Sequence, residues 1–376
     1  MSILARRFLT DAECSHGRPN FPLVLSPTGD HPLDAILGEL SAQRVELLDA
    51  LHRYGAILLR QCRIGTTDDV QQILAALDIA PSRENEYYGE VIREKVGANT
   101  MGVSRVADDR PITPHVEAYY WYKIPRYLAF FCKHSTCRYG ETPLFDCVGI
   151  AKDLPADLAR QLTEASVSME YRFPSQDAME AYSKWQYKNV WQRLFGTEDK
   201  RKVEAELDRD DVQFSWGRND GLVIKVLQPL ISTHPVTGEP CFRGVRYPSD
   251  ENYTYMLHTF IRPRMGYRLY ARNRLKFAVH STLERLGVLD PKDDIWTDRL
   301  VGKDLSRNEK RSLVRIYFEN CAIFRWQSGD MVLLDNLKTA HARLNIDAER
   351  EITLVTSQYI DKRDVFGQKE PGNRVI

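Results

Sequence analysis

Residues 313–335, LVRIYFENCAIFRWQSGDMVLLD, carry the pattern that decides the fold class, because β-rich runs lie on either side of a polar turn at 328–330. We expect two strands around this turn. EITLVTSQYI at 351–360 predicts a further strand, and residues 126–150 predict a hairpin of RYLAFFCKHS and ETPLFDCVGI. Strands are therefore expected in two separate blocks.

Helical patterns occur before and between these blocks. In residues 39–59, Leu47 and Leu51 share a helical face ahead of a β-rich run, which predicts a helix followed by a strand. Residues 176–207 and 253–287 also have helical character. This order predicts a mostly β fold with helices, an antiparallel barrel or jelly roll.

The domain organisation follows from what the sequence lacks. No repeat or Gly/Ser-rich linker divides it, so we expect a single domain over 1–376 with a helical insertion at about 171–290. The turn HPVTGEP (234–240) falls inside this insertion, and His234 is therefore interpreted as a turn residue rather than a metal ligand.

Composition excludes several classes of partner. Lys+Arg and Asp+Glu both number 52, so no net charge attracts nucleic acid or an anionic membrane. The sequence contains no run of about 18 apolar residues and no secretory signal, and we expect a soluble cytoplasmic protein. The seven cysteines are scattered without a C-x-x-C pair, which favours buried reduced thiols over disulfides or a zinc ribbon.

The strongest chemical signal is PITPHVEAYY (111–120). His115 and Glu117 are two residues apart, so on an extended strand both side chains would project from the same face. The third ligand that we expect is His341, which follows the strand ending at 335. Two histidines and one carboxylate on one side of a metal are typical of non-haem Fe(II) oxygenases, because the remaining positions stay open.

Other interpretations of these residues exist. H-x-E alone is also compatible with His115 as a hydrogen-bonded polar residue of the core. A zinc hydrolase can use two histidines and a glutamate, but its usual H-E-x-x-H helix is absent from the sequence.

Longer motifs resemble the taurine dioxygenase-like (TauD/TfdA) family of Fe(II)- and 2-oxoglutarate-dependent oxygenases, and within it the syringomycin-type aspartyl hydroxylase-like (SyrP-like) group. The resemblance implies a clavaminate synthase-like double-stranded β-helix with Fe(II), 2-oxoglutarate and O2 as cofactor and cosubstrates. It extends over most of the chain and includes YGAILLRQCRI (54–64), REKVG and PITPHVEAYY (93–120), LAFFCKHSTCRYGETPLFD with its preceding proline (125–146), FGT (195–197), HPVTGE (234–239) and FRWQSGDMVLLDN, HAR and the arginine that follows (324–350).

The resemblance also implies roles for single residues. His115, Glu117 and His341 match the iron ligands of the family. Thr142 and Arg350 match the residues that bind 2-oxoglutarate, whose distal carboxylate suits a planar bidentate donor beside a hydroxyl. The alternative for Arg350 is a surface ion pair with a neighbouring glutamate.

One further arginine and three departures from the family pattern concern the expected cosubstrate pocket. Arg343 is expected either to supply a cation for cosubstrate or substrate or to form a structural salt bridge. Three positions depart from the family pattern, namely Tyr139 in place of the first glycine of G-G-x-T, Val116 between the first two ligands and Leu354 in place of a second arginine.

The resemblance implies oxidative decarboxylation of 2-oxoglutarate coupled to hydroxylation of an unactivated C–H bond in a small polar, amino-acid-like substrate of secondary metabolism. Desaturation or cyclisation by the same cofactor is the alternative, and a non-catalytic small-molecule-binding barrel is the alternative of a different class. Halogenation is excluded because Glu117 occupies the position that chloride would need. The insertion is expected to close over the site, with Tyr182, Trp185 and Trp191 excluding water.

The substrate's form is left open by the sequence. The arginines at 262–274 could receive a substrate carboxylate or the phosphopantetheine of a carrier protein. The oligomeric state is not predicted.

Overall fold

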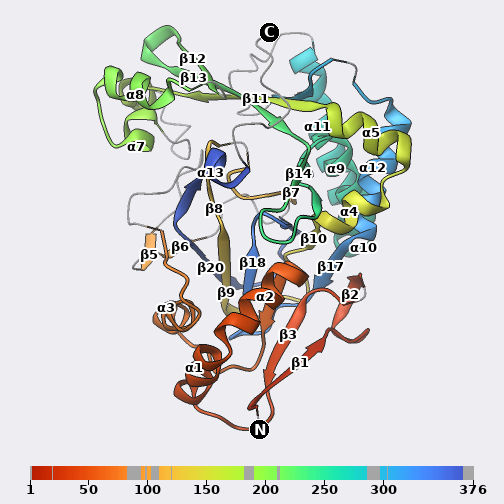
Figure 1. Ribbon diagram of the computed structural model, residues 1–376. Helices are drawn as coiled ribbons and strands as arrows, with labels where there is room; N and C mark the ends of the chain where they lie inside the picture. The colour runs from red at the N-terminus through yellow and green to blue at the C-terminus, as the bar shows by residue number, and fades with distance from the viewer. Residues whose placement is uncertain are drawn as a thin grey trace.

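The computed structural model describes residues 2–18, 20–82, 95–97, 100–102, 110–119, 121–181, 190–209, 212–285, 297–302 and 304–366. Within them, two β-sheets share an apolar core, and helices cover their outer faces (Figure 1). No helix among these residues is long and apolar enough to cross a membrane. All seven cysteines are free thiols and all except Cys14 are buried, which confirms the prediction of reduced thiols.

The large sheet includes β9, the longest strand of the first block. The order of the strands across this sheet is β1 (Leu4–Phe8), β3 (Leu23–Pro27), β4 (Ala56–Leu59), β18 (Met331–Asp335), β9 (Tyr127–Ser135), β20 (Arg350–Thr356), β6 (Thr100–Gly102) and β5 (Lys95–Gly97). β3 and β4 are parallel and the other neighbours are antiparallel. Alternate residues of β9 belong to different cores: Phe130 points toward the small sheet and Phe131 toward the helices, as the two-residue period of a strand requires.

The small sheet carries two of the predicted ligands. It comprises β2 (Cys14–Gly17), β17 (Cys321–Phe324), β10 (Leu144–Asp146), β19 (Thr339–Arg343) and β7 (Ile112–His115). Leu144 and Phe324 pack with Phe130 and Val332 of the large sheet in the core shared by the two sheets. The space between the sheets is therefore lined by side chains from both sequence blocks.

The hairpin predicted for 126–150 is wrong, although both of its strands exist. β9 pairs with β18 and β20, whereas β10 pairs with β17 and β19 in the other sheet. In the same way β17 and β18 follow one another in the chain but belong to different sheets. The beginning of 313–335 is also not a strand, because α12 (Arg307–Glu319) extends through it with a capping box at Ser306.

Helices cover the other face of the large sheet. The prediction for 39–59 is confirmed in outline, since α1 (Leu33–Ala42) and α2 (Arg44–Tyr54) precede β4, with Gly55 ending α2 in a left-handed conformation. α3 (Thr67–Ala76) begins at a capping box in which Thr66 and Asp69 exchange hydrogen bonds. Buried side chains of all three helices pack on β3, β4 and β18.

The segment from about 171 to 290 is mixed rather than purely helical. A further sheet has the order β12 (Val212–Trp216), β13 (Leu222–Pro229), β11 (Ser166–Phe173) and β16 (Thr297–Leu300), and a β-hairpin is formed by β14 (Ile231–Thr233) and β15 (Pro240–Phe242). The helices of this part of the chain and of its surroundings are α4 (Cys147–Asp153), α5 (Ala156–Glu164), α6 (Gln176–Ala181), α7 (Trp191–Phe195), α8 (Lys200–Leu207), α9 (Ser249–Met256), a π-helical turn (Leu257–Ile261), α10 (Arg262–Met265) and α11 (Tyr267–Arg285). In Figure 1 α4, α5, α9 and α12 gather to the right of the small sheet, and α7 and α8 lie at the far end of β12 and β13. The last strand among the described residues, β21 (Tyr359–Asp361), pairs with β8 (Lys123–Pro125) and is followed by α13 (Lys362–Phe366).

Candidate metal centre and cosubstrate pocket

The three predicted ligands converge at one end of the small sheet. His115 ends β7 and is the cross-strand partner of His341 in β19, with ring centroids 4.3 Å apart. Glu117 lies in the turn after β7, not on the strand that was expected to carry both residues, and its Oε2 is 3.8 Å from Nε2 of each histidine. The ligand-type atoms of the three side chains all lie within 4.8 Å of one another.

The surroundings of these side chains orient them toward a common point. Glu117 and His341 are buried, and the ring of His341 meets that of Phe130 of the large sheet at 4.9 Å between centroids. Nδ1 of His115 lies 2.9 Å from the carbonyl oxygen of Thr113. Since a carbonyl only accepts, Nδ1 carries the hydrogen, and the lone pair of Nε2 faces Glu117 and His341. Two imidazole nitrogens and a carboxylate could thus hold one cation from one side, with the other positions open.

Asn336 fixes the turn that presents Glu117, a role that the sequence did not reveal. Its Oδ1 accepts from the backbone N–H of Glu117 at 3.0 Å, and its Nδ2 donates to the carbonyl oxygens of Glu117 at 3.0 Å and Pro125 at 2.8 Å. Ala118, next in the turn, has a φ of +53°, in the left-handed region that costs energy for a residue with a side chain. The buried amide of Asn336 offsets that cost and holds the carboxylate in place.

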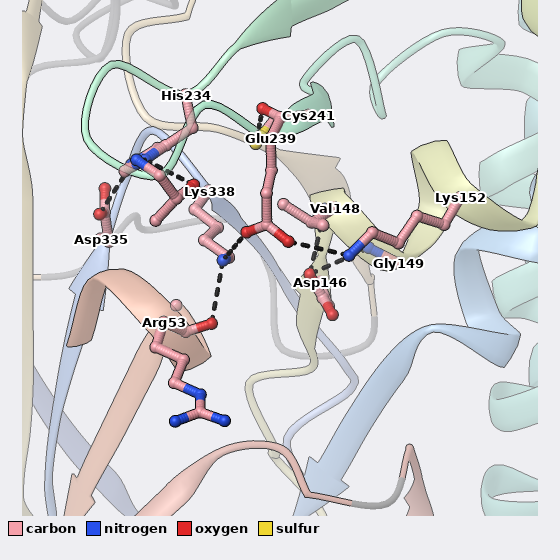
Figure 2. Close-up of polar contacts among 12 residues, drawn as sticks. Arg53, Asp146, Val148, Gly149, Lys152, His234, Glu239, Cys241, Asp335 and Lys338 are labelled. Atoms are coloured by element: carbon pink, nitrogen blue, oxygen red, sulfur yellow. Dashed lines mark hydrogen bonds and ion pairs between the residues drawn. The ribbon is translucent and has the colours of Figure 1, made fainter. Parts of the chain in front are cut away.

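Figure 2 shows how the turn that carries Asn336 is attached to the hairpin β14–β15. His234 Nε2 lies 3.0 Å from Asp335 Oδ2, with both side chains fully buried. Lys338 donates to Glu239 Oε2 at 2.8 Å and to the carbonyl oxygen of Arg53 at 2.9 Å. His234 is therefore a buried residue of the turn between β14 and β15, as the sequence predicted.

The predicted cosubstrate residues also meet. Thr142 Oγ1 accepts from Trp326 Nε1 at 3.1 Å and from Arg350 Nη2 at 3.4 Å, which directs its own hydroxyl hydrogen toward a third acceptor. Nε and Nη1 of Arg350 are buried and have no hydrogen-bond partner among the described residues. Burial, and then the neighbouring charge of Arg343, lower the pKa of Arg350 to about 10. A buried guanidinium with unused donors fits an anionic ligand.

Arg343 and the positions near the departures from the family pattern have different surroundings in the structure. Arg343 is buried and donates to the carbonyl oxygen of Arg110 at 2.9 Å. Gly140 has a φ of +105°, and a Cβ there would lie 3.4 Å from Cδ of Arg350, so this glycine leaves room for the arginine. Leu354, on β20, packs in the core between the sheets and brings no charge to the pocket. The neighbouring Glu141 forms a two-point ion pair with Arg264 at 2.8 and 3.0 Å, which connects α10 to the Thr142 loop.

A pocket lies beside His115. One wall comes from His115, Val116 and Tyr119, a second from Val167 and Met169 of β11, and a third from the loop 243–247 after β15.

The comparisons with known proteins agree with this geometry. The family model described as taurine catabolism dioxygenase TauD, TfdA family matches residues 22–271. The chain belongs to this dioxygenase family. Membership decides in favour of an oxidoreductase and against the non-catalytic barrel, and the family's Fe(II), 2-oxoglutarate and O2 are the cofactor and cosubstrates of this protein. Membership in the SyrP-like group stays a prediction. The match includes His115, Glu117 and Thr142, whereas His341 and Arg350 lie beyond it, so their assignment depends on the contacts described above.

Individual relatives of this TauD/TfdA protein are distant but match over nearly the full length. The dapdiamide synthesis protein DdaC of Enterobacter agglomerans is 22% identical over 348 residues, which cover 89% of this chain and 90% of the relative. A clavaminate synthase-like protein of Arabidopsis thaliana is 23% identical over 342 residues, which cover 88% of this chain and 92% of the relative.

Solved structures show the same fold. PvcB from Pseudomonas aeruginosa superposes with a TM-score of 0.52 and 15% identity over 94% of this chain and 91% of that one. A taurine dioxygenase from Burkholderia xenovorans gives a TM-score of 0.50 and 13% identity over 94% and 89%.

Proposed function

We propose that His115, Glu117 and His341 hold the catalytic Fe(II) of this TauD/TfdA oxygenase. The observation that carries the proposal is their convergence: three ligand-type atoms from two distant segments lie within 4.8 Å of one another, two of them on neighbouring strands. The two-histidine, one-carboxylate set has the composition that non-haem iron oxygenases use.

The second part of the proposal concerns 2-oxoglutarate. Arg350 would bind its distal carboxylate, Thr142 would donate a hydrogen bond to the same group, and Arg343 would add positive charge nearby. The bound iron, with 2-oxoglutarate and O2, supplies the oxidising equivalent that attacks a substrate C–H bond. The protein's own contribution is to hold the ligands, to bind the cosubstrate carboxylate and to keep water from the site.

We further propose a double-stranded β-helix for the two facing sheets and hydroxylation of an unactivated carbon in a small polar, amino-acid-like substrate. Two relatives bear names from biosynthesis, a dapdiamide synthesis protein and an oxygenase of an isonitrile synthetic pathway, which supports a place in secondary metabolism. Desaturation or cyclisation would use the same residues and stays the alternative outcome.

The insertion contributes to closing the site in this proposal. The loop 243–247 of the insertion forms one wall of the pocket beside His115, and Val167 and Met169 of β11, which lie just before the insertion, form another. Trp191 packs edge-on against Trp216 at 5.1 Å and donates to the carbonyl oxygen of Asp220, so it stabilises the insertion instead of lining this pocket. Tyr182 and Trp185, also expected to exclude water, lie outside the described residues.

Tethering of the substrate to a carrier protein stays part of the prediction. Of the arginines at 262–274, Arg264 pairs with Glu141 and Arg274 donates to Thr254, whereas Arg262, Arg268 and Arg272 are exposed on α10 and α11. The exposed arginines are the ones that could meet a carrier.

The test is to replace His341 with Ala and to measure Fe(II) binding and iron-dependent succinate release. We expect turnover to be abolished and iron affinity to fall by at least about tenfold, because one of three ligands is lost. His134→Ala is the matched control, since His134 is exposed on β9 outside the centre. Unchanged iron affinity in His341→Ala would remove the third ligand from the proposal.

A further inference from the structure

The pocket beside His115 contains two arginines that the sequence did not single out. Arg243 and Arg246 line it, and none of the described residues that line it carries a carboxylate. The rest of the lining is mainly apolar, with Val116, Val167 and Met169 among its members. A pocket of this composition suits a molecule with a carbon skeleton at one end and an anionic group at the other.

Arg243 is held rigidly at this position. Its side chain is 1% exposed, its Nε donates to Ser232 Oγ at 2.6 Å, and its guanidinium carbon lies 5.3 Å from the ring centroid of Tyr119. An arginine fixed by a hydrogen bond and an aromatic ring loses little conformational freedom when it binds a ligand.

The loop that carries both arginines is also fixed. The backbone N–H groups of Arg243 and Gly244 both donate to the carbonyl oxygen of Leu230, at 2.9 and 3.1 Å. A Cβ at Gly244 would lie 2.2 Å from Cδ2 and 3.2 Å from Cα of Leu230, so glycine lets the loop lie close to Leu230 without a shift of that residue. Asn252, buried at the start of α9, donates to the carbonyl oxygens of Val245 at 2.9 Å and Arg246 at 3.0 Å.

We propose that Arg243 and Arg246 form the substrate subsite of the enzyme and bind a carboxylate of a small organic acid. The acid's carbon chain packs on Val116, Val167 and Met169, which places it next to His115 and therefore beside the iron. This inference rests on the proposed function, and it deepens that proposal by naming the charged group of the substrate. The planar guanidinium fork matches a carboxylate, and the apolar lining favours an aliphatic chain over a second charged group.

The experiment measures succinate release stimulated by each proteinogenic L-amino acid, supplied as the free acid and as its primary amide. We expect a free acid to stimulate turnover and its amide to fail. Arg246→Met should raise the KM for that acid about 10- to 100-fold, as loss of a charge-assisted hydrogen bond predicts. Arg243→Lys, which keeps the buried charge and loses the fork, should raise the KM in the same direction. Arg311→Met, an exposed arginine on α12, is the control with unchanged KM.

A second readout separates the two proposals. Without O2, the visible charge-transfer absorbance of Fe(II) chelated by 2-oxoglutarate should form equally in the wild type, Arg246→Met and Arg243→Lys. Absence of that absorbance in the wild type would overturn the proposed function itself. Normal absorbance with equal stimulation by acids and amides, with no stimulation by any acid, or with an unchanged KM in both variants would overturn the carboxylate subsite alone.

Discussion

Arg60 and Arg350 are both largely buried at the large sheet, yet their surroundings differ. Arg60, directly after β4, donates to Asp330 at 2.8 and 3.1 Å, to Glu13 at 3.0 Å and to the carbonyl oxygen of Arg325 at 3.0 Å. Among the described residues, Arg350, at the start of β20, donates to Thr142 at 3.4 Å, and two of its other side-chain nitrogens have no hydrogen-bond partner.

The pKa values of the two groups express this difference. Burial alone would lower the pKa of Arg60, but hydrogen bonds and charge from Asp330 and Glu13 raise it. Burial and the charge of Arg343 lower the pKa of Arg350 to about 10. A buried charge with an ion-pair partner in the protein stabilises the fold, whereas one without an ion pair among the described residues favours an anionic ligand.

The largest effect on stability is expected when the ion pair between Arg60 and Asp330 is broken. Asp330→Ala leaves Arg60 with only its weaker partners and should lower the free energy of unfolding by about 3–5 kcal/mol. Urea denaturation of the metal-free protein measures this change. Glu13→Ala is the comparison, because Glu13 is partly exposed and should cost about 1 kcal/mol or less. A loss below about 1 kcal/mol in Asp330→Ala would show that Arg60 does not depend on its carboxylate partner.

Removal of Arg350 is expected to have the opposite effect on stability. Arg350→Met should leave the stability of the ligand-free protein unchanged or slightly higher, since an unpaired buried charge is removed. The affinity for 2-oxoglutarate should fall about 10- to 100-fold, because one or more charge-assisted hydrogen bonds are lost. Titration of the Fe(II)-loaded protein with 2-oxoglutarate measures the affinity, and Arg350→Lys should restore it only in part. Unchanged affinity in Arg350→Met would exclude this arginine from the cosubstrate site.

The same contrast explains what the sequence could predict at the site. The spacing of His115 and Glu117 suggested a shared target, and His341 was expected to join them; the three side chains converge in the structure. The resemblance supplied Thr142 and Arg350, which contact each other. Asn336, Arg243 and Arg246 were missed because their roles depend on contacts between distant segments. The one available signal for Asn336 was its place in a polar pair at the end of a strand.

Strand pairing was predicted less well than the strands themselves. Alternating apolar residues identified β9, β10, β17, β18 and β20, but alternation does not say which sheet a strand joins. The short connection within 126–150 favoured a hairpin, whereas it passes from one sheet to the other, as does the turn between β17 and β18. Local charge density likewise favoured the arginines at 262–274, although Arg264 is used in an ion pair with Glu141.

The smallest effect on stability is expected at Glu239, a carboxylate that is paired with two lysines but only partly buried. Glu239 accepts hydrogen bonds from Lys338 and Lys152, both at 2.8 Å, and its side chain is 33% exposed (Figure 2). Although partial burial raises it, these hydrogen bonds lower the pKa of Glu239 from 4.5 to about 2. A carboxylate whose pKa is lower in the folded state stabilises the fold above its unfolded pKa, and that stabilisation is lost as the pH falls from about 4.5 toward about 2.

The corresponding variant is Glu239→Gln, which keeps the shape of the side chain and removes its charge. Because solvent screens the exposed part of the group, we expect the wild type to be more stable than the variant by only about 1 kcal/mol near neutral pH. By about pH 3 less than half of that difference should remain, since the carboxylate is then protonated in the unfolded chain and partly so in the folded one. Urea denaturation of both proteins across this range gives the difference, and Glu198→Gln, at an exposed position, should show none. If the Glu239→Gln difference stayed constant with pH, the contact with Lys338 would stabilise the hairpin β14–β15 by its shape and not by its charge, and Glu239 would not belong with the charges that the protein neutralises.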